Sequence, residues 1–169
     1  YKTIAEISKE RIVREIKKNE KEIKGKKNLQ NENENKNLDL GFKAFKLSPS
    51  NFKIWRGNEI TEENLVEQLD AFTNPVREES KKENMLFELI LKAGYLLTDK
   101  IEVKEKFYAV NNGELIIALE EMNEKIIGNI ISAQPKKVIT LDNLFTDNDQ
   151  LKANTVLQMK DTGIDFKTI

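Results

Sequence analysis

Residues 107–119 read Phe-Tyr-Ala-Val-Asn-Asn-Gly-Glu-Leu-Ile-Ile-Ala-Leu, and this stretch decides the fold. Two apolar runs flank Asn111-Asn112-Gly113, and Asn-Gly tolerates the positive φ of a tight turn, so we expect a β-hairpin. The second arm, residues 115–119, is apolar on both faces, which is typical of an inner strand.

The residues after the hairpin predict two strand–helix units. Asn123 can cap a helix that runs to about Ser132, and residues 138–141 form a strand. A second helix over 149–160 and a final strand over 166–169 complete the chain. The order β-β-α-β-α-β predicts an α/β fold, a small mixed sheet with flanking helices. The second helix carries four apolar residues: Leu151, Val156, Leu157 and Met159.

Two shorter helices are expected before the hairpin. Residues 61–72 form the first, which we expect to bury Leu65, Val66, Leu69 and Phe72. Ser80 and Glu83 have capping-box spacing and open the second, which runs to about Leu97. Its apolar residues are Met85, Leu86, Leu89, Ile90 and Ala93. Upstream, residues 41–47 alternate between apolar and polar with the period of a strand. In the next segment, Trp55 stands among polar neighbours. Such a tryptophan is more often buried in a core or an interface than used to stack on a nucleic-acid base.

The chain begins with a long helix, over about residues 4–24, and Thr3 and Glu6 have capping-box spacing at its start. Ala5, Ile12, Ile16 and Ile23 form a narrow apolar stripe that must pack against another surface. Residues 25–38 are low in complexity and predict a linker. We therefore expect three parts: a helical arm (1–24), the linker (25–38) and an α/β domain (39–169).

The same helix carries a group of cations, which allows two interpretations. It is a solvated helix with one apolar edge, or it faces DNA phosphates through Arg11, Arg14, Lys17 and Lys18. Interleaved glutamates weigh against the second interpretation. The Lys26-Lys27 pair would extend the basic surface.

Composition excludes several classes of chemistry. The 169 residues contain no cysteine and no histidine, so disulfides, thiol nucleophiles, zinc sites with thiolate or imidazole ligands and Ser-His-Asp catalysis are excluded. The seven glycines and three prolines are isolated, so GxGxxG, a P-loop and an Asp-Pro-Pro-Tyr type motif are absent as well. The net charge of −1 argues against a generally basic nucleic-acid binder. No stretch approaches the ~20 apolar residues of a membrane span, and the lack of cysteine is compatible with the cytoplasm.

The best candidate constellation comes directly after the strand at 138–141. Asp142 stands at its carboxyl end, where ligands collect in open α/β sheets. Such an acidic cluster can hold Mg²⁺ or face another protein, with Asp165 as a weak second carboxylate. Alternatively, residues 147–149 cap the next helix. The candidate interface residues are Asp142, Phe145, Asn148, Asp149, Lys152 and Asn154.

Three segments carry a family resemblance: YKTIAEISKERI at 1–12, LGFKAFKLSPSNFKIW at 40–55, and DNLFTDNDQLKAN at 142–154, running on to 166–169. Their order and spacing resemble the carboxyl-terminal part of the methylation (Mod) subunit of type III restriction-modification systems, which are adenine-specific DNA methyltransferases. Since the chain also begins at Tyr1 rather than Met, we expect it to be a piece of a longer protein.

The resemblance implies a parent enzyme that uses S-adenosylmethionine, but no catalytic or cofactor-binding residue can be carried over, because the family's cofactor loop and Asp-Pro-Pro-Tyr type motif do not occur here. It implies a second Mod subunit, a restriction (Res) subunit and DNA as partners, and no membrane. We expect a non-catalytic assembly domain. The alternatives are a DNA-contacting module and a small Mg²⁺-dependent enzyme built around Asp142.

Overall fold

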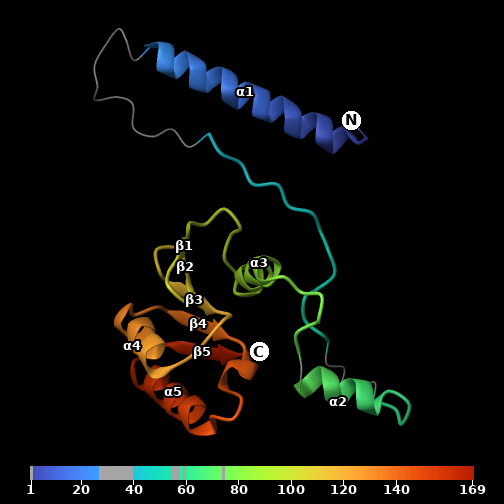
Figure 1. Cartoon of the computed structure of the whole chain (residues 1–169), viewed down its shortest axis with the longest axis vertical. Coiled ribbons are helices and arrows are strands. Elements are labelled where there is room, and N and C mark those ends of the chain that lie inside the picture. Colours follow the sequence, from blue (N-terminus) through green and yellow to red (C-terminus); the bar gives the residue numbers. More distant parts are fainter. Residues whose placement is uncertain (1, 27–39, 55–57, 59, 74) are drawn as a thin grey trace. The chain divides into compact units, whose positions relative to one another are not determined.

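The computed structural model describes residues 2–26, 40–54, 58, 60–73 and 75–169. It divides into two compact units, residues 1–46 and residues 47–169 (Figure 1). Trp55, Lys27 and most of the expected linker lie outside the described residues, so the three-part division stays a prediction.

A five-stranded mixed sheet forms the centre of the second unit. Its strands lie in sequence order: β1 (Ile101–Val103), β2 (Tyr108–Val110), β3 (Leu115–Ala118), β4 (Lys137–Thr140) and β5 (Asp165–Thr168). β1, β2 and β3 pair antiparallel, whereas β3, β4 and β5 pair parallel. The predicted α/β class and mixed sheet are therefore confirmed, with one addition. The three-residue edge strand β1, flanked by charged residues, was not predicted.

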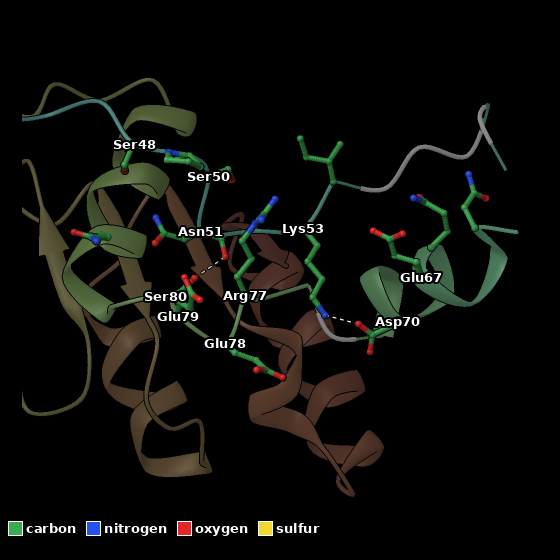
Figure 2. A pocket seen from close by; sticks show the side chains of 15 residues that line it. Ser48, Ser50, Asn51, Lys53, Glu67, Asp70, Arg77, Glu78, Glu79 and Ser80 are labelled. Atoms are coloured by element: carbon green, nitrogen blue, oxygen red, sulfur yellow. Dashed lines mark hydrogen bonds and ion pairs between the residues drawn. The ribbon is translucent and has the colours of Figure 1, made fainter. Parts of the chain in front are cut away.

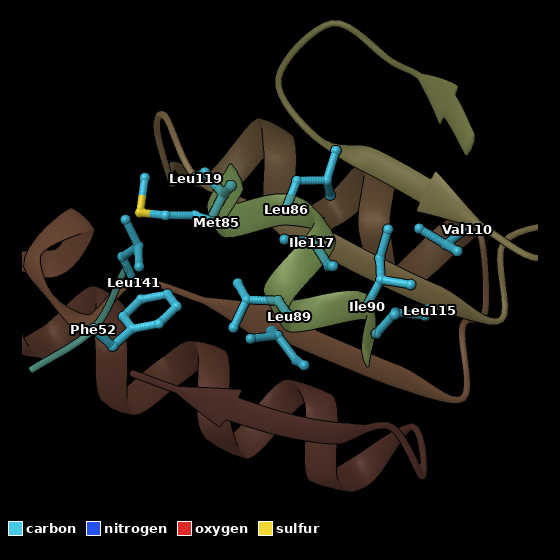
Figure 3. Packing of buried hydrophobic residues seen from close by; sticks show 11 residues of the cluster. Phe52, Met85, Leu86, Leu89, Ile90, Val110, Leu115, Ile117, Leu119 and Leu141 are labelled. Atoms are coloured by element: carbon cyan, nitrogen blue, oxygen red, sulfur yellow. The ribbon is translucent and has the colours of Figure 1, made fainter. Parts of the chain in front are cut away.

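Helices cover both faces of this sheet (Figure 1). α3 (Lys82–Lys92) packs on one face, and α4 (Glu124–Ser132) and α5 (Asp149–Asp161) pack on the other. Alternate residues of β3 point into the two cores, Leu115 and Ile117 toward α3 and Ile116 and Ala118 toward α4 and α5. Figure 3 shows the first of these cores. The strand predicted to be apolar on both faces is thus an inner strand.

The turn of the hairpin has the backbone that the sequence predicts. Asn111, Asn112 and Gly113 have φ of 49°, 57° and 87°. Asparagine and glycine adopt positive φ at low cost, which explains the choice of residues.

α3 buries Met85, Leu86, Leu89 and Ile90 but is shorter than expected at both ends. The capping box at Ser80 was wrong, because the N-cap is Lys81, which makes no side-chain cap hydrogen bond. The Ser80 hydroxyl instead donates to the carbonyl of Asn51 at 2.8 Å. The hydrogen bond to Asn51 thus takes the place of the predicted helix cap.

α2 (Leu65–Thr73) differs more strongly from expectation. Leu65, Val66 and Leu69 are 42%, 78% and 50% exposed, so their predicted burial was wrong in this structure. The side chain of Phe72 lies outside the described residues. Residues 40–50 form no strand, and an isolated antiparallel bridge joins Phe52, just after them, to Val76.

α5 buries only part of its apolar residues. Thr155 and Met159 are fully buried, and Leu151 is partly buried, whereas Val156 and Leu157 are 43% and 59% exposed. The helix therefore contacts the sheet through positions i, i+4 and i+8.

α1 (Ile4–Lys26) has the predicted start. The Thr3 hydroxyl accepts the backbone N–H of Glu6 at 3.2 Å, and the Glu6 carboxylate accepts the N–H of Lys2 at 2.7 Å. No side chain described in α1 is buried. Its isoleucines are therefore available to another surface.

Candidate functional site

The predicted acidic segment begins directly after β4. Asp142 starts a 3₁₀ helix, Asp142–Phe145, and its backbone N–H donates to the carbonyl of Ile169 at 2.8 Å, which joins this loop to the end of β5. The buried Oδ1 of Asp142 makes no hydrogen bond of standard geometry, but the Lys152 ammonium lies 2.6 Å away and balances its charge. The structure thus brings two of the six candidate residues together as an ion pair.

Three of the four remaining candidates in this segment contribute to folding. The Asn148 side chain caps α5 by accepting the N–H of Leu151 at 3.0 Å, and Asp149 lies in the first turn of that helix. Phe145 is buried and meets Phe166 edge-on at 6.4 Å between ring centroids. Asn154 is exposed on α5. The capping interpretation is confirmed for Asn148.

The two carboxylates suggested for a metal site do not lie together. Asp142 follows the carboxyl end of β4, whereas Asp165 begins β5 and pairs in register with Lys137 at the amino end of β4. The Asp165 carboxylate lies 3.4 Å from the Lys137 ammonium and 4.0 Å from that of Lys167. Within the described ranges, no group of three or more acidic side chains is placed to hold an ion. Asp142 and its neighbours therefore form an ion-paired loop.

Five of the eight cations of α1 lie on one side of the helix. At about 100° per residue, Arg11, Arg14, Lys17, Lys18 and Lys21 fall within roughly a third of its circumference, opposite the apolar stripe. All five are exposed. Arg14 pairs with Glu10 at 2.8 Å, and Lys18 lies 3.9 Å from Glu15. The glutamates that interleave in the sequence thus lie mostly outside the cationic side of the helix.

A cluster around Glu88 was missed by sequence reasoning. Glu88 on α3 accepts hydrogen bonds from the Ser50 hydroxyl at 2.5 Å, the Asn51 backbone N–H at 2.7 Å and the Asn51 amide at 2.8 Å. The Lys92 ammonium lies 2.8 Å away. Burial by itself would raise the pKa of Glu88, but Lys92, Ser50 and Asn51 together outweigh it and lower the pKa to about 2.

These contacts hold residues 50–53, which we call the strap, against α3. The Lys53 N–H donates to the carbonyl of Pro75 at 2.7 Å, and the Arg77 N–H donates to that of Asn51 at 2.9 Å. Phe52 is buried in the α3 core, and the Lys92 ammonium lies 4.9 Å from its ring centroid. One feature of the sequence could have indicated this cluster. Glu88 lies beside the apolar face of α3, four residues before Lys92, where a helical ion pair can form.

A groove of about 1000 Å³ lies beside the strap. Residues 48–54, the polar side of α2 and residues 77–80 line it (Figure 2). Lys53 reaches across to Asp70 of α2 at 2.5 Å, and Glu67, Glu78 and Glu79 add negative charge. The groove is therefore polar and mainly acidic.

Comparison of the chain with protein-family models, curated proteins and solved structures gave no match. Among the helices in the described part of the chain, none combines the length and apolar character needed to cross a bilayer.

Proposed function

We propose that the chain is a non-catalytic assembly domain of a type III restriction-modification methyltransferase, which serves Mod dimerisation, docking of the Res subunit, or both. The observation that carries this proposal is the apolar stripe of α1. Ile12 is 46% exposed, and Ile16 and Ile23 are only partly buried. A charged helix with such a stripe gains stability by covering it with another surface.

The polar groups of the second unit favour the same proposal. In the segment 142–154, which carries part of the family resemblance, Asp142 is ion-paired and Asn148 caps a helix. Both contribute to folding, and neither is held ready for a reaction. In the family that the chain resembles, S-adenosylmethionine and adenine are bound through motifs that this sequence does not contain.

Calorimetry and mass measurement test the proposal. We expect no stoichiometric binding of S-adenosylmethionine to the 169-residue chain. We also expect a dimer of about twice 19.6 kDa by light scattering, or co-purification with the Res subunit of the same system. Stoichiometric cofactor binding would contradict the proposal, and so would a monomer that fails to retain Res.

DNA contact is a second candidate function, favoured by the five cations on one side of α1. Neutralising phosphates releases counterions, so binding of duplex DNA should weaken as salt rises. Charge reversal at Arg11, Arg14, Lys17 and Lys18 should abolish this binding. Binding that persists after reversal would show that these cations are not its cause.

A further inference from the structure

α2 has an unusual orientation for an amphipathic helix. Figure 2 shows Glu67 and Asp70 on the side of α2 that faces Lys53 and the groove. At about 100° per residue, Leu65 and Leu69 lie on the opposite side. This apolar side is exposed, since about half of the surface of Leu65 and of Leu69 is open to solvent. The described part of the chain thus leaves the apolar face of α2 without a cover.

The net charge of the segment that contains this face narrows the choice of partner. Residues 60–79 contain six acids and one arginine, a net charge of −5. α1 contains eight cations and five acids, a net charge of +3, and its exposed stripe has comparable apolar side chains. Opposite charge steers two surfaces together, and burial of the apolar side chains then stabilises the contact.

We propose that the apolar face of α2 binds the apolar stripe of α1 from a second copy of this chain. The exchange is reciprocal, so one dimer contains two equal contacts, as a two-fold axis requires. The five cations on the opposite side of α1 from the stripe contribute to steering and stay exposed in the dimer. The inference rests on the proposed assembly function and names the surfaces that perform it.

Two double variants of the full 169-residue chain test the contact. The stripe variant carries Ile12→Glu and Ile16→Glu, and the face variant carries Leu65→Glu and Leu69→Glu. Each places charge in the proposed contact, and all four positions are at least partly exposed, so folding should be retained. Sedimentation equilibrium should show that each variant self-associates at least about tenfold more weakly than the unchanged chain.

Matched controls carry the same kind of substitution at exposed apolar residues outside the contact. Ile4→Glu with Ile7→Glu changes α1 off the stripe, and Leu91→Glu with Leu157→Glu changes α3 and α5. Both control variants should dimerise like the unchanged chain. Equal weakening of the controls would overturn the proposal.

Mixing the two contact variants identifies the pairing between copies. The face variant retains an intact α1, and the stripe variant retains an intact α2, so an equimolar mixture can form one of the two contacts. We expect a heterodimer that is tighter than either variant alone. A mixture that stays monomeric would overturn the exchange, since it would mean that the helices pair within their own chains or not at all.

The outcomes also separate this inference from the assembly function. If the unchanged chain dimerises and both contact variants do so equally well, the α1–α2 contact is wrong while the assembly function stands. If the unchanged chain neither dimerises nor retains the Res subunit, both proposals fail.

Discussion

α4 and α1 use the same apolar residue type at helical spacing, with opposite results. In α4, Ile126, Ile127 and Ile130 are 6%, 3% and 0% exposed. In the apolar stripe of α1, Ile12 is 46% exposed, and Ile16 and Ile23 are only partly buried. The two helices differ in their connections, because α4 joins two paired strands and chain connectivity itself places it on the sheet. Amphipathic spacing therefore shows that a helix has an apolar side to bury. The connections of the helix determine whether that side packs against the same chain.

Truncating one isoleucine from each helix should give the largest difference. Ile130→Ala should lower the free energy of unfolding of the α/β domain by about 2–5 kcal/mol, because it removes buried methyl groups and leaves a cavity. Ile7→Ala in α1 should change it by less than about 0.5 kcal/mol. Urea titration followed by circular dichroism measures both. A similar loss at Ile7 would mean that α1 is an integral part of the domain core.

Two glutamates extend the comparison to charge. Glu88→Gln should cost about 1–3 kcal/mol of unfolding free energy, because an enclosed, multiply hydrogen-bonded carboxylate loses its charge. Glu10→Gln, which affects an exposed pair on α1, should cost less than about 0.5 kcal/mol. The same urea titrations measure both changes, and equal costs would contradict the difference in environment.

The pH dependence gives an independent check on Glu88. Its pKa is lower in the folded chain than the ordinary 4.5, so its stabilising contribution is complete above about pH 4.5 and is lost as the pH falls toward 2. The unfolding free energy of Glu88→Gln should therefore fall less steeply over this range than that of the unchanged chain. Parallel slopes in acid titrations would contradict the assignment.

Helix caps provide the smallest contrast. Asn148→Ala removes the cap of α5 and should destabilise the α/β domain by about 1 kcal/mol. Thr3→Ala removes the corresponding contact of α1 and should lower helix content without shifting unfolding of the domain. Asn154→Ala, at an exposed position on α5, serves as the control. A loss at Asn154 equal to that at Asn148 would argue against capping as the cause.

Local signals account for the parts of the fold that the sequence predicts well. Asn111-Asn112-Gly113 encodes its own turn, and Asn123 accepts the N–H of Ile126 at 3.0 Å as a cap should. Residues 115–119 are apolar at every position, which leaves only an inner strand as a stable solution. Such features require no knowledge of distant residues.

Tertiary contacts explain what the sequence does not predict. Ser80 has the spacing of a cap but donates to Asn51, 29 residues away. In the sequence, Glu88 resembles the other surface glutamates, and only the fold brings Ser50, 38 residues away, into hydrogen-bond contact with it. The exposed face of α2 shows a different limit, since periodicity finds the apolar side of a helix but gives no information about the molecule that covers it.

The strap also determines how the domain responds to tension. Force that enters the chain from α1 reaches residues 50–53 before it reaches any strand. To pass further, it must break the hydrogen bonds at Glu88 and pull the ring of Phe52 out of the α3 core. Residues 50–53 therefore serve as a mechanical anchor that shields the parallel strands from load applied through α1.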